Sequence, residues 1–323
     1  MLKRLGTWDV LVIVVLVAVI IGSSILVEGF ASSRFWGFLL LDVIPIALIA
    51  LPMTLIVITG EIDLSVASVL GLSSAVMGQL WLHGLPLPLI LPLVVLLGAV
   101  LGAVNGLFIT GFGLPSLAVT IGTLALYRGL AYVVLGDKAV ADFPFSWTGN
   151  MIEALPGTTV PWVALVVLVL AVVFAVVLHA TPIGRGLYAI GNNDQAAAFS
   201  GISVARTKFW LFVLTGTVAA LAGFFWTMRY ASARADNGAG LELSVVAAVL
   251  LGGVSIFGGR GTLVGVMAGV LLLITLRNAL QLADVPADTL TVVTGTLLII
   301  SVVGPNAASM LRARIRRRRP ATA

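Results

Sequence analysis

Long apolar segments follow one another along almost the whole chain, separated by short stretches of charged residues, prolines and glycines. Each segment is close to the ~20 residues that an α-helix needs to cross the apolar layer of a bilayer. The pattern therefore predicts an all-α, multi-pass membrane protein with about ten spanning helices. They are expected at residues 9–27, 37–59, 63–81, 88–110, 115–135, 160–180, 207–228, 242–257, 261–281 and 288–303.

The composition supports this interpretation. Of the 323 residues, 60% are hydrophobic and only 10% are charged, and the mean hydropathy is +1.17. Soluble domains are on average about 25% charged, and disordered chains combine low hydrophobicity with high charge. Because the chain has no cysteine and only two histidines, His83 and His179, we expect no catalytic residue, no metal site and no bound cofactor.

Basic residues are distributed unevenly. The formal net charge is +5, and a basic tail at 311–323 contains Arg312, Arg314, Arg316, Arg317, Arg318 and Arg319. Such a tail is typical of a topology anchor at the anionic cytoplasmic leaflet, so no nucleic-acid partner is expected. With the N-terminus inside, twelve basic residues fall in inside segments and four in outside segments. Both termini are therefore predicted to be cytoplasmic.

The loop at 181–206 lies on the predicted inner side and contains a polar stretch with the features of a short helix. Asn193 or Asp194 is a suitable N-cap, alanines favour the helix, and a glycine follows as a stop. An ordinary solvated loop helix and a functional element remain equally open from this pattern. The candidate residues are Asn193, Asp194, Gln195, Ala196, Ala197, Ser200 and Gly201.

A repeated pattern relates the two halves of the chain. The sequence DLSV at 63–66 recurs as ELSV at 242–245, and Asn105 with a later GTL recurs as Asn278 with a later GTL. The copies lie five spans apart, an odd number, so they cross the membrane in opposite directions. We therefore predict inverted-topology repeats at 37–135 and 207–304, an arrangement common in transporters.

The chain lacks the chemistry to power transport by itself. None of its three lysines lies in a G-x-x-x-x-G-K-[ST] phosphate loop, and no carboxylate is expected at mid-membrane depth. A few polar residues within or beside the spans could line a path for a hydroxylated solute. For the two arginines, snorkelling to the surface is the alternative. The candidates are Asp63, Asn105, Arg128, Arg277 and Asn278.

Five segments together resemble the membrane permeases of ribose-type ABC sugar importers. They are GEIDLSV at 60–66, NG at 105–106, LAVTIGTL at 117–124, IGNN at 190–193 with the residues up to Gly201, and LGGVSIFGG at 251–259. The similarity covers about residues 9–305. Residues 50–54 and 232–236 are most similar to the rhamnose and autoinducer-2 branches of that family.

The resemblance implies a single permease domain over 1–323, in the bilayer of a bacterial cell membrane. Its expected partners are a second permease copy, identical or related, an extracytoplasmic solute-binding protein and an ABC ATPase that holds ATP and Mg²⁺. The helix at 193–201 would then be the coupling helix that contacts this ATPase. A self-sufficient facilitator or ion-coupled carrier is the second hypothesis, and an integral membrane enzyme the third.

Overall fold

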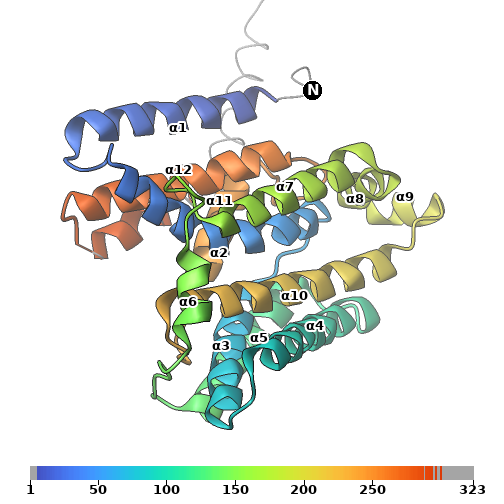
Figure 1. Ribbon diagram of the computed structural model, residues 1–323. Coiled ribbons are helices and arrows are strands. Elements are labelled where there is room, and N and C mark those ends of the chain that lie inside the picture. Colours follow the sequence, from blue (N-terminus) through green and yellow to red (C-terminus); the bar gives the residue numbers. More distant parts are fainter. Residues whose placement is uncertain (1–5, 287, 294, 297–298, 300–323) are drawn as a thin grey trace, which may run out of the picture.

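The computed structural model describes residues 6–286, 288–293, 295–296 and 299 (Figure 1). Its helices are α1 (Thr7–Leu26), α2 (Ser33–Ile58), α3 (Val66–Leu82), α4 (Leu87–Gly111), α5 (Ser116–Leu135), α6 (Phe145–Ile152), α7 (Trp162–Ala180), α8 (Pro182–Asn192), α9 (Asp194–Phe199), α10 (Val204–Tyr230), α11 (Leu241–Leu251) and α12 (Leu263–Leu282). Extended backbone pairs within the described residues only at two isolated bridges, Val140 with Ala233 and Ala154 with Pro161. The prediction of an all-helical fold is therefore confirmed for this part of the chain.

Seven of these helices are long and apolar enough to cross a membrane, namely α1, α2, α4, α5, α7, α10 and α12. Two shorter apolar helices, α3 and α11, coincide with the third and eighth predicted spans. The tenth predicted span, 288–303, lies largely outside the described residues, and the basic tail at 311–323 lies wholly outside them. The count of ten spans and the position of the termini therefore stay predictions.

The eighth predicted span is too long, because its helix stops early. The apolar sequence continues to Phe257, but α11 ends at Leu251 after 11 residues. Gly253 follows with a φ of +87°, a left-handed conformation that glycine adopts easily and that terminates a helix. The residues between α11 and α12 form a loop, which hydrophobicity alone could not indicate.

α2 lies inside the bundle, whereas α1 lies along its edge beside α12 (Figure 1). In the most apolar window of α2, 94% of the residues are buried, compared with 17% in α1. The two helices have similar hydropathy, 2.5 and 2.8, so their neighbours decide which becomes core. α2 packs against α7, α10, α11 and α12. Exposed apolar side chains of α1, such as Val14 and Ile21, form a surface suited to lipid.

Small residues bring α4 and α10 into close contact. Gly98, Gly102 and Gly106 recur every four residues along one face of α4. A Cβ built on Gly102 would overlap the Phe212 carbonyl, and one on Gly98 would overlap the Gly216 carbonyl. Glycine spacing of this kind lets helix backbones approach one another. The stripe is therefore a packing surface.

The loop at 181–206 contains two helices instead of the single short one predicted. α8 (Pro182–Asn192) precedes α9 (Asp194–Phe199), and both lie at the same end of the bundle (Figure 1). α8 was missed because three of its eleven residues are glycines, yet Leu187 and Ile190 are buried on one face and Thr181 caps the helix through a hydrogen bond from the Gly184 amide. The opposite long loop contains another unpredicted helix, α6 (Phe145–Ile152).

Candidate functional site

α9 begins and ends where its sequence predicts. The Asn193 side chain accepts a hydrogen bond from the Ala196 amide at 2.9 Å, which satisfies one of the free N–H groups of the first turn. At the other end, Ser200 is the C-cap and Gly201 has a φ of +85°. The predicted N-cap at Asn193 and the glycine stop are confirmed.

Most of the α9 surface is exposed. Asp194, Gln195, Ala196 and Ser200 are exposed, whereas Ala197 is buried at 3% exposure. Ala197 therefore packs against the rest of the protein and is not accessible to a partner. Phe199 is 93% exposed, although an aromatic ring of this size is normally at least partly covered. The sequence predicts that Phe199 lies in this helix, but it was not among the candidate contact residues.

α8 joins this segment firmly to the core. A Cβ on Gly191 would overlap the Ile58 carbonyl at the end of α2, so the two backbones touch there. The Gly259 amide donates to the same Ile58 carbonyl at 2.8 Å, and the Tyr188 hydroxyl donates to the Gly261 carbonyl at 2.7 Å. The end of α2, the end of α8 and the loop before α12 are thus tied together.

A groove of about 490 Å³ runs beside α9, and we call it the α9 groove. Asp194 and Gln195 form one wall, and the α4–α5 turn forms another. Its inner wall contains a partly buried ion pair between Lys208 Nζ and Glu61 Oε1 at 2.6 Å. This pair joins the start of α10 to the turn after α2, and sequence reading missed it because the two residues lie far apart in the chain.

Two of the predicted path residues, Asp63 and Asn105, belong to one sealed polar network. The Asp63 carboxylate accepts hydrogen bonds from the Ser65 amide at 2.9 Å and the Ser65 hydroxyl at 2.6 Å. The Asn105 amide donates to Ser65 Oγ at 2.8 Å, and the Tyr127 hydroxyl donates to Asn105 Oδ1 at 3.3 Å. All four side chains are buried. The network joins α3, α4 and α5 and lines neither of the two hollows described in this section.

Arg128 points into the protein. Its guanidinium donates to the carbonyls of Ala67 at 2.9 Å, Ala235 at 2.6 Å and Asn237 at 2.9 Å. These contacts fasten α5 to α3 and to the segment at 231–240. Snorkelling to the surface was one of two interpretations of Arg128. This geometry does not show snorkelling, because carbonyl dipoles of the protein itself stabilise the charged group.

Asn278 belongs to a second polar cluster at the far end of α10. Its amide donates to Asp42 Oδ2 at 2.6 Å, and Arg229 forms an ion pair with Asp42 Oδ1. The Arg229 guanidinium also lies 4.9 Å from the centre of the Tyr230 ring, a cation–π contact. The cluster joins α2, α10 and α12, and it is more exposed than the Asp63 network because the Asp42 side chain is 32% accessible.

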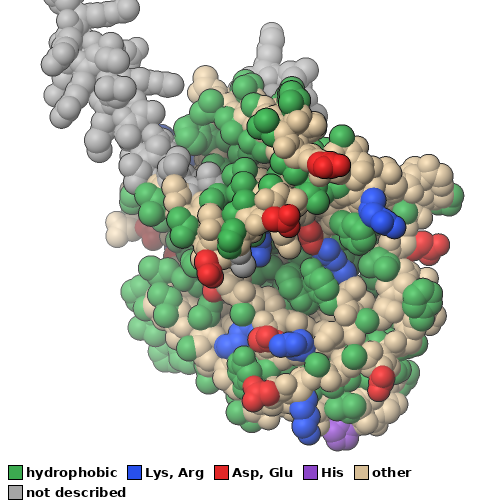
Figure 2. All heavy atoms as spheres, turned by 90° about the vertical axis from the view of Figure 1, so that its left-hand side faces the viewer, with side chains coloured by type: hydrophobic (Ala, Val, Ile, Leu, Met, Phe, Trp, Pro, Cys, Tyr) green, Lys and Arg blue, Asp and Glu red, His purple; other side chains and the backbone are tan. Residues whose placement is uncertain are grey.

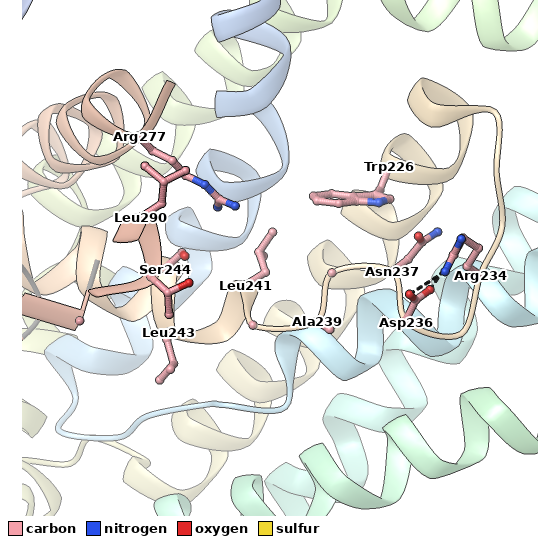
Figure 3. A pocket seen from close by; sticks show the side chains of 14 residues that line it. Trp226, Arg234, Asp236, Asn237, Ala239, Leu241, Leu243, Ser244, Arg277 and Leu290 are labelled. Carbon is pink, nitrogen blue, oxygen red and sulfur yellow. Dashed lines mark hydrogen bonds and ion pairs between the residues drawn. The ribbon is translucent and has the colours of Figure 1, made fainter. Parts of the chain in front are cut away.

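Figure 2 looks onto the face opposite α9, where acidic and basic side chains surround a recess. A hollow of about 550 Å³ opens here, and we call it the α10–α12 hollow. It lies between the end of α10, the start of α11 and the last part of α12, beside the segment that joins α10 to α11. Arg277 lines one side of it, and Trp226 with the ion pair of Arg234 and Asp236 lines the other (Figure 3). Arg277 is the only predicted path residue that the structure places at this hollow.

No metal centre is evident in the residues described, since no three His, Asp or Glu side chains there could hold an ion together. Chemically, the two hollows offer hydrogen bonding and apolar contact, and neither contains a nucleophile paired with a base. The geometry suits binding and movement of a solute or partner.

Comparison with known proteins identifies the family. Residues 36–302 match the family described as "Branched-chain amino acid transport system / permease component". A ribose import permease protein of Bacillus subtilis is 41% identical over 79% of this chain and 80% of its own length. Autoinducer 2 import system permease proteins of Photorhabdus temperata and Yersinia enterocolitica are 33% and 34% identical, over 89% and 81% of both chains.

No solved structure matches this chain. The family match covers most of the sequence, and the relatives cover at least 79% of this chain and at least 80% of their own length. Together with the long apolar helices, these matches place the protein among multi-pass proteins of the bacterial inner membrane. The chain belongs to the ribose-type family of ABC import permeases, which the family signature and the ribose and autoinducer-2 relatives define.

Proposed function

We propose that this chain is the membrane-spanning subunit of an ATP-driven importer for a small sugar or sugar-like solute, such as ribose, rhamnose or autoinducer-2. A partner ATPase supplies the energy by hydrolysing ATP with Mg²⁺, and an extracytoplasmic binding protein delivers the solute. A second permease copy, identical or related, completes the pathway. The names of the ribose and autoinducer-2 relatives support the solute class.

The observation that carries the proposal is the exposed helix α9. A helix of six residues with one buried alanine and a phenylalanine exposed to 93% has little reason to be stable on the surface of an isolated chain. Asp194, Gln195 and Ala198 of the same helix line a groove of about 490 Å³, and an exposed ring on a helix beside a groove is typical of a docking surface. We assign Asn193, Asp194, Gln195 and Phe199 to the ATPase contact.

Rigid contacts connect α9 to the spanning helices. Gly191 touches the end of α2 at Ile58, and Lys208 is paired with Glu61 at the start of α10. If a partner displaced α8 and α9, α2 and α10 would therefore move with them. Little of this movement would be absorbed by flexible loops. An importer needs such a mechanical link if ATP-driven closure of a partner is to change the conformation of the spanning helices.

Helix packing supports the predicted inverted repeats. α4 of the first copy packs against α10 of the second, and α12 of the second copy packs against α2 of the first. α3 begins at the end of the first of the two related motifs, α11 contains the second, and both helices are largely buried. Such an exchange of partners is what two copies related by a two-fold axis in the membrane plane would produce.

A paired substitution on α9 tests the docking role. Asp194→Arg with Phe199→Glu changes two exposed side chains, so the chain is expected to insert and fold normally. Co-purification of the ATPase and ATP-dependent uptake should both fall by more than about tenfold, because a charge replaces the apolar anchor. Ala197 is left unchanged, since its burial means that a substitution would disturb α9 itself.

Phe145→Glu provides the matched control. Phe145 is 83% exposed on α6, at the opposite end of the bundle, so the same chemical change should leave the ATPase bound. Normal ATPase binding by the α9 variant would refute the docking role. Equal loss in both variants would show that the effect is a general one on folding.

A further inference from the structure

The α10–α12 hollow has the size and lining of a small-molecule site. Its volume of about 550 Å³ lies within the ~300–1,000 Å³ typical of ligand pockets. An indole, an amide, a hydroxyl and charged groups converge on it, from Trp226, Asn237, Ser244, Asp236 and Arg277. A mostly apolar surface with a few placed polar groups is the usual composition of a pocket that orients a polar ligand.

Trp226 and Arg277 face the open space from opposite sides (Figure 3). The Trp226 ring is half-buried and packs against the Tyr230 ring with centroids 5.1 Å apart. Arg277 is exposed, and within the described residues it forms no ion pair. One wall therefore offers a flat apolar surface and the other a planar set of hydrogen-bond donors.

The two walls are held in place from behind. Asn278, next to Arg277, donates to Asp42 at 2.6 Å, and Asp42 is paired with Arg229. Arg229 in turn lies over the Tyr230 ring, against which Trp226 packs. A continuous set of contacts thus fixes the indole relative to the part of α12 that carries Arg277, which reduces part of the ordering cost of binding.

The charged groups of the hollow suit a ligand with many oxygens. Asp236 accepts two hydrogen bonds from Arg234, at 2.8 and 2.9 Å, and this contact lowers the pKa of its carboxyl. Arg277 forms no ion pair within the described residues, so its donors are available to a ligand. Sugar hydroxyl groups accept from arginine and donate to a carboxylate, a ring oxygen accepts only, and the C–H face of a sugar ring packs on an indole.

We propose that the α10–α12 hollow binds one sugar ring, stacked on Trp226 and held through its hydroxyl groups by Arg277, Asp236 and Asn237. The site receives the solute before it enters the membrane path, so the proposal rests on the importer function proposed above. It gives each permease copy its own solute contact, separate from the selection made by a binding protein.

Direct binding tests this site without requiring transport. Full-length protein in lipid nanodiscs is titrated with D-ribose, L-rhamnose and autoinducer-2 while tryptophan fluorescence is recorded. We expect a saturable change with at least one of these solutes, lost in Trp226→Phe and kept in Trp210→Phe. Trp210 is the matched control because it lies near the other end of α10 and is 57% exposed.

Arg277→Ala provides a second variant whose readout does not depend on removing the fluorophore. It should raise the half-saturating concentration about tenfold, since a hydrogen bond to a charged group is lost. The proposal is overturned if no solute gives a saturable change in the wild type, or if the change persists in Trp226→Phe.

These outcomes are separable from failure of the importer function. Uptake by the complete transporter requires the ATPase and the binding protein, whereas the titration requires neither. A wild-type transporter that moves sugar but shows no Trp226-dependent binding refutes the site alone. A chain that binds sugar but supports no ATP-dependent uptake refutes the importer function and leaves the site established.

Discussion

Two asparagines that occupy equivalent positions in the repeated pattern have different surroundings. Asn105 is fully buried and bonded to Ser65 and Tyr127. Asn278 is half-buried and bonded to the partly accessible Asp42, and its neighbour Arg277 lines the α10–α12 hollow. The first half of the molecule thus closes around its polar residues, while the second half leaves them beside an open hollow.

The difference shows that a repeat determines the position of a residue on its helix but not the residues that surround it. α4 packs on α10, which covers it with close-fitting backbone, whereas α12 packs on α1, α2 and α11. One hollow lies beside α9 and the other beside Arg277, at opposite ends of the bundle. Two different ends are what a protein needs if it moves a solute in one direction. Three sets of substitutions test this contrast, beginning with the largest effect.

Gly102→Leu should have the largest effect, because it separates the two halves. The new side chain would collide with the Phe212 backbone on α10, and backbone cannot move aside as a side chain can. We expect little folded protein, measured as the monodisperse fraction after detergent extraction. Gly122→Leu is the control, since a Cβ there meets nothing within 4 Å. Equal yields of the two variants would contradict the close packing of α4 on α10.

Asn105→Leu should destabilise the protein by about 2 kcal/mol, and Asn278→Leu by less than about 1 kcal/mol. The first leaves the Ser65 and Tyr127 hydroxyls with fewer partners in a dry interior. The second removes a donor from Asp42, but Arg229 remains and water can reach the carboxylate. Thermal unfolding of the purified variants measures both. A larger loss for Asn278→Leu would show that the sealed and open halves have been assigned the wrong way round.

The smallest effect is expected at the rim of the hollow, from the Arg234–Asp236 ion pair. The contact with Arg234 lowers the pKa of Asp236 below its ordinary value of 3.8. A depressed carboxyl pKa stabilises the folded state above the ordinary value, and this contribution is lost as the pH falls through the lower folded-state value. Asp236→Asn should therefore remove a slight acid-dependent loss of thermal stability, and it should change nothing at neutral pH beyond the loss of an exposed pair.

An unchanged acid profile in Asp236→Asn would show that the pair is absent in solution. Arg234→Gln is the companion variant, because it should raise the Asp236 pKa toward the ordinary value and flatten the same profile.

Much of the fold follows from the sequence because a bilayer forces long apolar runs into helices. Most span positions within the described residues and the caps of α9 follow from local patterns. The early end of α11 does not, since a glycine turn inside an apolar run carries no hydropathy signal. α8 was missed although it has an apolar face with Leu187 and Ile190, because three glycines in eleven residues suggest a loop.

The site was less predictable, since it depends on contacts between distant segments. Arg128 was identified as unusual, but its three carbonyl partners come from α3 and from the segment at 231–240. The pair Glu61–Lys208 joins the turn after α2 to the start of α10, and the pair Asp42–Arg229 joins the first half of α2 to the end of α10. One signal could have suggested them, namely opposite charges near matching ends of two antiparallel spans.

The central claim is that this permease moves solute only when a partner hydrolyses ATP, and uptake by reconstituted proteoliposomes tests it most directly. The complete transporter, with its ATPase and binding protein, is compared with the permease alone, each with Mg²⁺ and either ATP or a non-hydrolysable analogue. We predict accumulation of labelled sugar against its gradient only in the complete transporter with ATP. Equal uptake by the permease alone, without ATP, would contradict the account and identify a self-sufficient carrier.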